Sequence, residues 1–305
     1  MSAQILVGKP VVEKIAAELV PIIEQFRKEH GIAPTLAVLR VGNAPAAVSY
    51  AHSIDHQFTT CGMGFQMEAL PENTTTEAVI ERLAELDRTD RVHGILLQRP
   101  LPKSLDMKAI MAAMPITKDV EGGSPINLGK LALDVGEYFP TSTPSAAMEI
   151  FKHYEISIEG KRAVVIGRSA ILGKPMALLL IQANATVIVC HSHTQNLAEL
   201  TRQADLLIAA AGKPKIITAD MVAPSSVVID FGVNVVKDQI VGDIDFEDVK
   251  EIVSAITPVP GGTGPVTTMM LMRNTIHAAQ HLVKQMGTRG IIRWLPTLKS
   301  PKRRK

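Results

Sequence analysis

The sequence predicts an α/β fold in which two blocks of parallel β-sheet are each covered by helices. Short apolar runs rich in β-branched residues alternate with amphipathic stretches long enough for helices, an alternation typical of parallel sheets with helical crossovers. Clusters of Pro, Gly and Thr at residues 140–145 and 257–265 interrupt this alternation and mark boundaries between blocks. A chain of 305 residues is long enough for about two domains with a large buried core.

The individual elements follow from hydrophobic periodicity. We expect strands at the short, continuous apolar runs, which are residues 35–42, 93–101, 162–167, 185–190, 205–212 and 226–232. We expect helices at the amphipathic stretches, which are residues 9–29, 46–61, 75–88, 144–153, 173–183, 195–203 and 264–286.

The boundary clusters divide the chain into a first α/β domain at residues 1–143 and a second at residues 144–265. The C-terminal helix, counted as residues 266–288 in this division, is expected to return to the first domain and complete it. Residues 289–305 are rich in Lys and Arg, and we expect a solvated basic tail there. A contact between this tail and nucleic acid or a membrane stays open.

Composition excludes several classes of protein. A net charge of +2 gives no overall field that favours nucleic acid, and no apolar run is long enough to span a membrane. Cys61 and Cys190 are too few for a disulfide framework and fit a reducing compartment. Residues 1–20 lack the apolar core and cleavage site of a signal peptide, and no Cys/His cluster has zinc spacing. We therefore expect a cytoplasmic protein without a metal ion.

A glycine-containing turn between a predicted strand and helix is the strongest local signal for ligand binding. The stretch VVIGRSAILGKP places Gly167, Ser169 and Gly173 between a buried strand and the first turn of a helix. Backbone amides at a helix N-terminus, with the positive end of the helix dipole, favour phosphate. The spacing G-x-S-x-x-x-G is related to the dinucleotide-binding motif G-x-G-x-x-G without matching it. An ordinary glycine turn in a βα unit stays an alternative.

The end of the next strand indicates which dinucleotide is bound. NAD-specific domains usually carry a carboxylate there, which holds the ribose hydroxyls. Here the strand ends in CHSHT, with His191 and Ser192 and without a carboxylate. Ser192 and Arg168 can both bind a 2′-phosphate, so the sequence favours NADP over NAD. Surface histidines at a strand end are the other interpretation of His191 and His193.

These features belong to a longer series of ordered motifs. The motifs are VGNAPAAVSY (41–50), HGILLQRPLP (93–102), KDVEGGSPINLGKL (118–131), TSTPSA (141–146), AVVIGRSAILGKPMALLL (163–180), ATVIVCHSHT (185–194), ADLLIAAAGKP (204–214), VVIDFGVN (227–234), GDIDF (242–246) and ITPVPGGTGPVTTMML (256–271). With them the chain resembles the methylenetetrahydrofolate dehydrogenase/cyclohydrolase family over about residues 3–286. The resemblance implies a folate-binding domain, a Rossmann-like NADP-binding domain, a reaction cleft between them, and homodimers formed through the Rossmann-like domains.

The resemblance also implies which positions contact tetrahydrofolate one-carbon derivatives and NADP. The catalytic positions of the family fall on Tyr50, Gln98 and Glu121. The substrate-binding positions fall on Tyr50, Gln98, Pro100, Leu101, Glu121, Gly262 and Pro265. The cofactor-binding positions fall on Thr143, Gly167, Arg168, Ser169, Gly173, His191, Ser192, Ala211, Gly212, Val233 and Thr267.

The sequence departs from the family pattern on the folate side. The family has lysines four and six residues after the tyrosine, where this sequence has Ile54 and His56. Arg99 follows Gln98 in place of a leucine, and Glu121 replaces an aspartate that contacts the pterin ring. The nucleotide turn is intact. We therefore expect altered chemistry at the folate rather than loss of all activity.

The two reactions of the family make different demands on position 54. Hydride transfer from methylenetetrahydrofolate to NADP⁺ needs close approach of two rings and no protein base. Hydrolysis of the methenyl product to formyltetrahydrofolate moves protons, and acid–base assistance is typically worth ~10² to 10⁴ in rate. In the family the lysine, held by Gln98 and adjacent to Tyr50, is the candidate for that assistance. Because Ile54 cannot carry a proton, we predict an NADP-dependent dehydrogenase of one-carbon metabolism with weak or absent cyclohydrolase activity.

Three alternatives to this prediction stay open. The chain is fully bifunctional if another group, such as Tyr50 or Arg99, moves the proton. It acts on a different reduced pterin if only the one-carbon substrate has changed. It binds NADP and a folate-like ligand without turnover if it is a sensor or a partner subunit.

Overall fold

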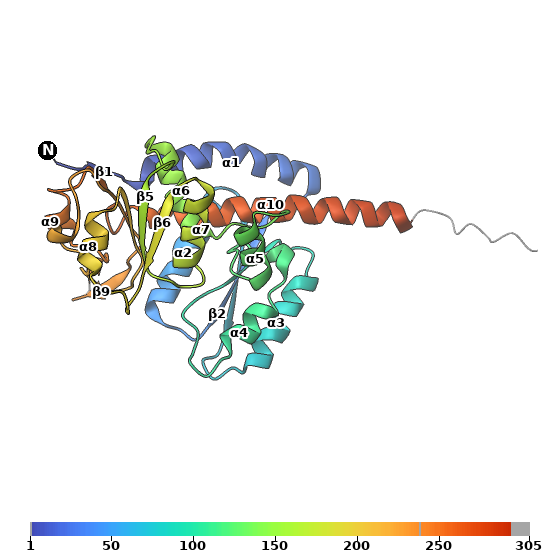
Figure 1. The fold of residues 1–305 in the computed structure, drawn as a ribbon. Coiled ribbons are helices and arrows are strands. Elements are labelled where there is room, and N and C mark those ends of the chain that lie inside the picture. The colour runs from blue at the N-terminus through green and yellow to red at the C-terminus, as the bar shows by residue number, and fades with distance from the viewer. Residues whose placement is uncertain (1, 238, 294–305) are drawn as a thin grey trace, which may run out of the picture.

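The structure is a computed structural model that describes residues 2–237 and 239–293, with residues 285–293 described by their backbone alone. Two parallel sheets, one of six strands and one of three, lie along the C-terminal helix α10 (Thr263–Arg293) (Figure 1). Helices connect the strands within each sheet. The α/β architecture of parallel sheets that the sequence predicts is therefore confirmed.

The three-stranded sheet has the order β3-β2-β4, with β2 (Thr35–Val41) in the centre. Helix α2 (Pro45–Thr60) connects β2 to the edge strand β3 (Gly64–Leu70). Helix α3 (Thr76–Arg88) then leads to β4 (Gly94–Leu97), whose four residues are all buried. Both crossovers return to a parallel strand, so β2 and β4 end at the same edge.

Short elements follow β4 and shape the loop between residues 118 and 125. They are α4 (Met107–Ala112), a 3₁₀ turn at Ile116–Lys118 and α5 (Pro125–Leu133). Both helices begin at capping residues: the side chain of Asp106 accepts from the amide of Lys108, and that of Ser124 accepts from the amide of Asn127. The Ser124 cap thereby fixes the end of the loop that leads into α5.

The six-stranded sheet has the order β1-β11-β8-β7-β5-β6, with β6 at an open edge. Its strands are β1 (Gln4–Ile5), β5 (Arg162–Ile166), β6 (Thr186–Cys190), β7 (Leu206–Ala209), β8 (Val227–Asp230) and β11 (Ala255–Ile256). Its helices and connecting elements are α7 (Gly173–Gln182), α8 (Leu197–Arg202), a 3₁₀ turn at Ala219–Met221, α9 (Phe246–Val249) and the hairpin of β9 (Asn234–Val236) and β10 (Gln239–Val241).

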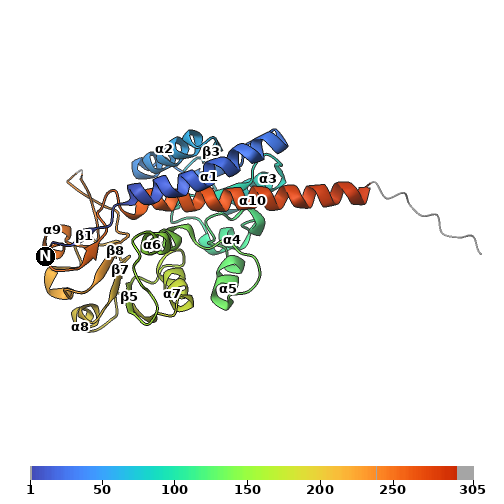
Figure 2. The same cartoon turned by 90° about the horizontal axis from the view of Figure 1, so that it is seen from above.

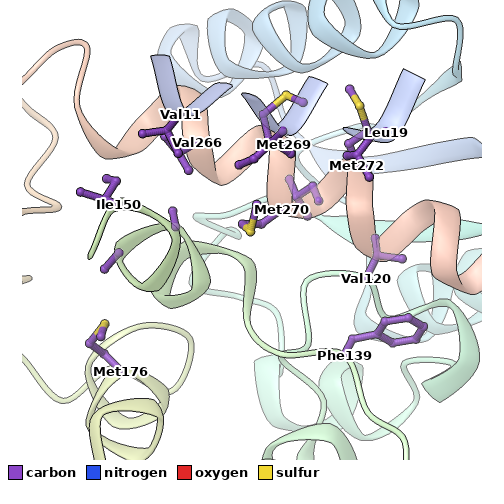
Figure 3. Packing of buried hydrophobic residues seen from close by; sticks show 14 of the residues in the cluster. Val11, Leu19, Val120, Phe139, Ile150, Met176, Val266, Met269, Met270 and Met272 are labelled. Carbon is purple, nitrogen blue, oxygen red and sulfur yellow. The ribbon is translucent and has the colours of Figure 1, made fainter. Parts of the chain in front are cut away.

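Three helices pack together between the two sheets. Helix α1 (Gly8–His30) and α10 run side by side (Figure 2), and α6 (Ser142–His153) packs against both. Figure 3 shows Val266 and Met272 of α10 beside Val11 and Leu19 of α1, and all four side chains are buried. The methionine-rich run at residues 269–273 contributes to this core, because Met269, Met270 and Met272 are at most 3% exposed.

Some elements differ from the sequence-based expectations. The edge strand β3 was not predicted, because its half-buried residues GFQMEAL form no continuous apolar run. Helix α10 continues to Arg293, beyond the expected residue 288, and residues 294–305 of the expected tail lie outside the described residues. Strand β1 pairs with β11 of the six-stranded sheet, although the predicted division places residues 4–5 in the first domain. The domain boundaries themselves stay a prediction.

Candidate active site

Gln98 follows strand β4 and joins the sheet to helix α2. Its amide donates to the carbonyl of Leu39, and its side-chain Nε2 donates to the carbonyl oxygen of Ala47 over 2.6 Å. The residue is 3% exposed, and its Oε1 is buried without a hydrogen-bond partner among the described residues. A buried acceptor left unpaired costs about 1–3 kcal/mol. This oxygen is therefore an acceptor available to a ligand.

Tyr50 and Ile54 lie one turn apart on α2 but in different surroundings. Tyr50 is 39% exposed, whereas Ile54 is fully buried in the hydrophobic core. Position 54 is therefore filled by an apolar side chain, and no charge stands there. His52 and His56 are exposed, as expected for residues that face away from Tyr50 and Ile54.

The loop before α5 is organised by the carboxylate of Asp119. This carboxylate accepts from the amides of Gly123 and Ser124, over 3.2 and 2.7 Å, and from Nδ2 of Asn127 over 2.8 Å. The neighbouring carbonyl of Val120 accepts from Nδ2 of Asn274 on α10 over 2.8 Å. Glu121 lies between these two residues and Ser142, whose Oγ donates to the carbonyl of Val120 and whose amide donates to the carbonyl of Glu121. These bonds hold the backbone at Glu121, while its carboxylate accepts no hydrogen bond from the described residues.

The carboxylate of Glu121 is mostly removed from solvent. Its side chain is 21% exposed, and burial raises its pKa to about 7; the Arg99 guanidinium lowers that pKa and Asp119 raises it. The distance from Nη2 of Arg99 to Oε2 of Glu121 is 3.9 Å. Although Tyr50 as a whole is 39% exposed, burial around its hydroxyl group, and then the Glu121 charge, raise the pKa of that hydroxyl. Tyr50, Arg99 and Glu121 therefore meet in one site.

Arg99 also lies close to the glycine turn that follows β5. Its Nη2 lies 3.4 Å from Sδ of Met111, and its Nε is buried without a partner among the described residues. A Cβ added at Gly123 would lie 3.4 Å from Nη2 of Arg99 and 3.5 Å from Cγ2 of Ile171. Because Ile171 belongs to the glycine turn after β5, that turn adjoins the loop of Glu121.

The glycine turn leaves no room for side chains at two positions. A Cβ at Gly167, where φ is +132°, would lie 2.2 Å from the carbonyl oxygen of Ala210. A Cβ at Gly173, the first residue of α7, would lie 2.2 Å from the carbonyl oxygen of Gly167. Oγ of Ser169 accepts from the amides of Leu172 and Gly173. The turn therefore keeps its backbone close against the N-terminus of α7, which fits a dinucleotide phosphate.

The ends of β5 and β6 bring the expected ribose-binding residues together. The amide of Gly167 donates to the carbonyl of Cys190 over 2.9 Å, so the residues after the two strands are neighbours. The amide of His191 donates to Oγ1 of Thr194, and Nδ1 of His191 accepts from the amide of His193. The side chains of Arg168 and Ser192 are exposed at this edge, where a phosphate group can reach them.

We compared the sequence with models of known protein families to identify the family of this chain. The model described as tetrahydrofolate dehydrogenase/cyclohydrolase, catalytic domain, matches residues 6–121, and the one described as NAD(P)-binding domain of the same family matches residues 141–283. The chain belongs to the tetrahydrofolate dehydrogenase/cyclohydrolase family. The resemblance inferred from the sequence motifs is confirmed, and residues 141–283 match the NAD(P)-binding domain of the family.

Relatives match nearly the whole chain. A bifunctional protein FolD from Chloroflexus aurantiacus is 47% identical over 281 residues, which are 92% of this chain and 98% of the relative. The crystal structure of the bifunctional FolD methylenetetrahydrofolate dehydrogenase/cyclohydrolase from Campylobacter jejuni has a TM-score of 0.88 at 42% identity, covering 92% and 99% of the two chains. The FolD of Trypanosoma brucei, solved with NADP and an inhibitor, has a TM-score of 0.89 at 32% identity, covering 93% and 99%.

The other predicted site residues of this family member lie in loops or, for Thr143, Pro265 and Thr267, in the first turns of α6 and α10. The half-buried ones are Leu101, Thr143, Ala211 and Pro265, the exposed ones are Pro100, Gly212 and Val233, and the buried ones are Gly262 and Thr267. Gly262 lies against the start of α1, because a Cβ on Gly8 would lie 2.2 Å from its carbonyl oxygen. The contacts of these residues with ligands stay a prediction.

Two buried aspartates, Asp230 and Asp243, fix the loops that carry Ala211, Gly212 and Val233. Oδ2 of Asp243 accepts from the amides of Ala211 and Gly212 over 2.6 and 2.8 Å, and its Oδ1 accepts from Nδ2 of Asn234. Asp230 in turn accepts from the amide of Asp243. The sequence shows that Asp230 lies near the end of a predicted strand. It does not show that Asp243 bonds to residues about 30 positions earlier in the chain.

We searched the described part of the chain for metal-binding clusters and for membrane-spanning helices. Residues 2–237 and 239–293 contain no group of three or more His, Cys, Asp or Glu placed to hold a metal ion. The same residues contain no helix of the length and apolarity that crossing a bilayer requires. Cys61 and Cys190 are free thiols.

Proposed function

We propose that this family member oxidises 5,10-methylenetetrahydrofolate to the methenyl form with NADP⁺. The observation that carries the proposal is the junction at Gly123, where the loop of Glu121 meets Ile171 of the glycine turn. Hydride transfer requires the reacting rings to be held in contact, and adjoining ligand sites supply that proximity. Residues 1–143 with 266–288 would hold the folate, and residues 144–265 the dinucleotide.

On one side of this junction we expect the residues that contact the folate. The pterin would lie against Tyr50 and Gln98, with Glu121 at its edge. Oε1 of Gln98 supports this placement, since a pterin donor would satisfy it. The further substrate contacts would come from Pro100, Leu101, Gly262 and Pro265.

The NAD(P)-binding domain favours NADP. When bound, NADP⁺ supplies the hydride acceptor, and this chain's residues hold and orient it. Gly167, Ser169 and Gly173 would receive the diphosphate at the N-terminus of α7, and Arg168 and Ser192 the 2′-phosphate. His191, Thr143, Ala211, Gly212, Val233 and Thr267 would complete the site. The NADP complex of the Trypanosoma brucei relative supports the same preference.

We also propose that the cyclohydrolase step is slower than in relatives that carry a lysine at position 54. Ile54 is fully buried and has no group that could carry a proton. In the family Gln98 holds the lysine, and here its Oε1 has no hydrogen-bond donor among the described residues. Loss of an acid–base group costs ~10² to 10⁴ in rate. Hydride transfer needs no such group, so it would be preserved.

Full bifunctionality is the second candidate, and the comparisons favour it. The Chloroflexus aurantiacus relative is named a bifunctional protein at 47% identity, and the Campylobacter jejuni structure is titled a dehydrogenase/cyclohydrolase. For this chain to match them, a group other than the residue at position 54 must move the proton.

A homodimer in the cytoplasm fits the surface of the NAD(P)-binding half. Strand β6 is an open edge whose Val189 is 40% exposed, and Ile181 on the neighbouring helix α7 is 55% exposed. An apolar, β-branched edge strand is a template for pairing with another copy. The two free thiols fit a reducing compartment.

The test follows both half-reactions in one cuvette. Purified protein receives methylenetetrahydrofolate and NADP⁺, and the absorbances of NADPH and methenyltetrahydrofolate are recorded together, with a protein-free sample as control. We expect NADPH to form and the methenyl product to accumulate transiently.

Other outcomes separate the alternatives. NADPH formation without methenyl accumulation would favour the bifunctional candidate. NADPH formation only with another reduced pterin would mean a changed substrate. Binding of NADP and folate without NADPH formation would overturn the proposed activity and leave a non-catalytic paralogue.

A further inference from the structure

Ring opening of methenyltetrahydrofolate, the second step of the family's chemistry, needs a group that takes a proton from water. We propose that Glu121 is this catalytic residue in the present chain and that Arg99 positions its carboxylate. The substrate comes from the proposed function, on which this assignment rests. It would account for hydrolysis by a chain in which residue 54 is apolar.

Two carboxylates stand two residues apart in the loop before α5, and only one of them is free for chemistry. Asp119 accepts three hydrogen bonds from Gly123, Ser124 and Asn127, and these fix the loop. The carboxylate of Glu121 accepts no hydrogen bond from the described residues, and its nearest cation is Arg99, 3.9 Å away. Glu121 therefore retains lone pairs for a water molecule.

The other polar groups nearby are unsuited to accepting a proton from water. Burial and the Glu121 charge keep the hydroxyl of Tyr50 protonated, because both raise its pKa. An arginine such as Arg99 is effectively always protonated. His52 and His56 are exposed on the far side of α2 from the buried Ile54.

The electrostatics suit Glu121 to this role. The pKa of Glu121 is raised to about 7, mainly by burial, which the Arg99 charge opposes and the Asp119 charge reinforces. The titratable and charged groups that face it are thus Arg99 after β4, Tyr50 on α2 and Asp119 in its own loop. A base whose pKa lies near the working pH is both populated in its ionised form and strong enough to accept a proton.

Glu121 alone can perform the proton transfers that ring opening requires of the protein. As the oxygen of water bonds to the methenyl carbon, Glu121 takes a proton from that water, and the cation becomes a neutral hydroxyl adduct. The bond from this carbon to one of its two nitrogens then breaks, and protonated Glu121 returns its proton to that nitrogen. The adduct's hydroxyl proton leaves to solvent as the formyl group forms. One proton is released for each water consumed.

Arg99 fits a positioning role. Its Nη2 is held between Sδ of Met111 and Oε2 of Glu121, so the guanidinium restrains the carboxylate without neutralising it by a close contact. Its positive charge favours the ionised form of Glu121, which is the form that accepts the proton.

The test supplies methenyltetrahydrofolate directly, without NADP, and measures enzymatic hydrolysis from about pH 5.5 to about pH 8.5 after subtraction of the spontaneous rate. The wild-type kcat is expected to rise with pH through an inflection near the Glu121 pKa of about 7. Glu121→Gln should lose the inflection and lower kcat by ~10² to 10⁴ with a smaller change in KM. Glu121→Asp should keep the inflection, and Arg99→Met should move it to higher pH.

Glu81→Gln, on an exposed face of α3, is the matched control and should behave as wild type. An unchanged inflection in Glu121→Gln, or a wild-type rate equal to the spontaneous rate, would overturn the assignment. NADPH formation from methylenetetrahydrofolate, measured on the same preparations, reports separately on the proposed dehydrogenase. Failure of that assay with intact hydrolysis would therefore sink the proposed function and leave Glu121 as the hydrolytic base.

Discussion

The Nε2 of Gln98 donates to the carbonyl oxygen of Ala47 over 2.6 Å, which ties the end of β4 to the first turn of α2. The same side chain leaves its Oε1 buried and unpaired among the described residues. One amide thus serves two purposes. Its donor holds the helix that carries Tyr50, and its acceptor is left available to a ligand.

Gln98→Met should separate binding from stability. Methionine removes the hydrogen bond to Ala47 and also the unpaired oxygen, and these effects offset each other to within about 1 kcal/mol in the free energy of unfolding. If Oε1 accepts a hydrogen bond from the pterin, KM for methylenetetrahydrofolate should rise about tenfold or more while KM for NADP⁺ is unchanged. Steady-state kinetics and urea denaturation measure both, with Gln66→Met on strand β3 as control. An unchanged folate KM would show that the oxygen serves no ligand.

Ile54→Lys should restore fast hydrolysis at a cost in stability. The new ammonium would enter a fully buried position, so the free energy of unfolding should fall by about 2–4 kcal/mol. Methenyl hydrolysis should rise ~10²-fold or more if a lysine there meets Gln98 and the substrate. Ile54→Met is the control, since it keeps the volume and adds no proton carrier. A folded Ile54→Lys protein that hydrolyses no faster than Ile54→Met would contradict the role assigned to this position.

Sequence patterns predicted the two parallel blocks because their central strands are continuous apolar runs, as in β2 and β5. They predicted the glycine turn because close packing at Gly167 and Gly173 excludes any side chain. They did not predict α5, because its nine residues PINLGKLAL are too few to show a helical repeat of apolar residues. They did not predict β1 and β11 either, because each of these strands has only two residues.

The site was less accessible to sequence reasoning. The changes to Ile54, Arg99 and Glu121 are visible in the sequence, but the proximity of Arg99 to Glu121 arises only because the loop after β4 folds back on the loop before α5. The same holds for the approach of Gly123 to Ile171, where two segments that are far apart in the chain lie side by side. Spacing carries no information on such long-range contacts.

Arg168→Gln should shift the cofactor preference. Removing a charge-assisted contact to the 2′-phosphate costs about 1.5–3 kcal/mol, so KM for NADP⁺ should rise about 10- to 100-fold. KM for NAD⁺ should stay nearly constant, because NAD⁺ lacks that phosphate. Arg88→Gln, at the end of α3, is the control. Equal losses with both dinucleotides would mean that Arg168 supports the turn rather than the 2′-phosphate.

Val189→Lys should convert a dimer into monomers. The lysine would place a charge on the open edge strand β6, where Val189 is 40% exposed, and charged edge residues oppose pairing of strands between chains. Sedimentation equilibrium of wild type and variant measures the association. Val236→Lys, on the exposed hairpin strand β9, tests whether any exposed valine has this effect. A wild type that is monomeric at all concentrations would contradict the proposed interface.

His93 should make the stability depend on pH below neutrality. It is 1% exposed, its Nδ1 accepts from the amide of Thr35, and burial, followed by the charges of Lys118 and His30, lowers its pKa to about 4. Above the unfolded pKa of about 6.5 both states are neutral and the contribution is complete. As the pH falls from there towards 4, the unfolded chain takes up the proton and the folded protein does not, so about 3 kcal/mol of stability is lost.

Urea denaturation of wild type and His93→Gln across this pH window isolates the effect of that histidine. Glutamine keeps an acceptor for the Thr35 amide and does not titrate, so the variant's free energy of unfolding should fall less than that of the wild type as the pH is lowered. His52→Gln, which changes an exposed histidine, should follow the wild-type curve. Parallel curves for wild type and His93→Gln would mean that His93 is protonated in the folded protein, and the hydrogen bond from Thr35 to Nδ1 could not then exist as described.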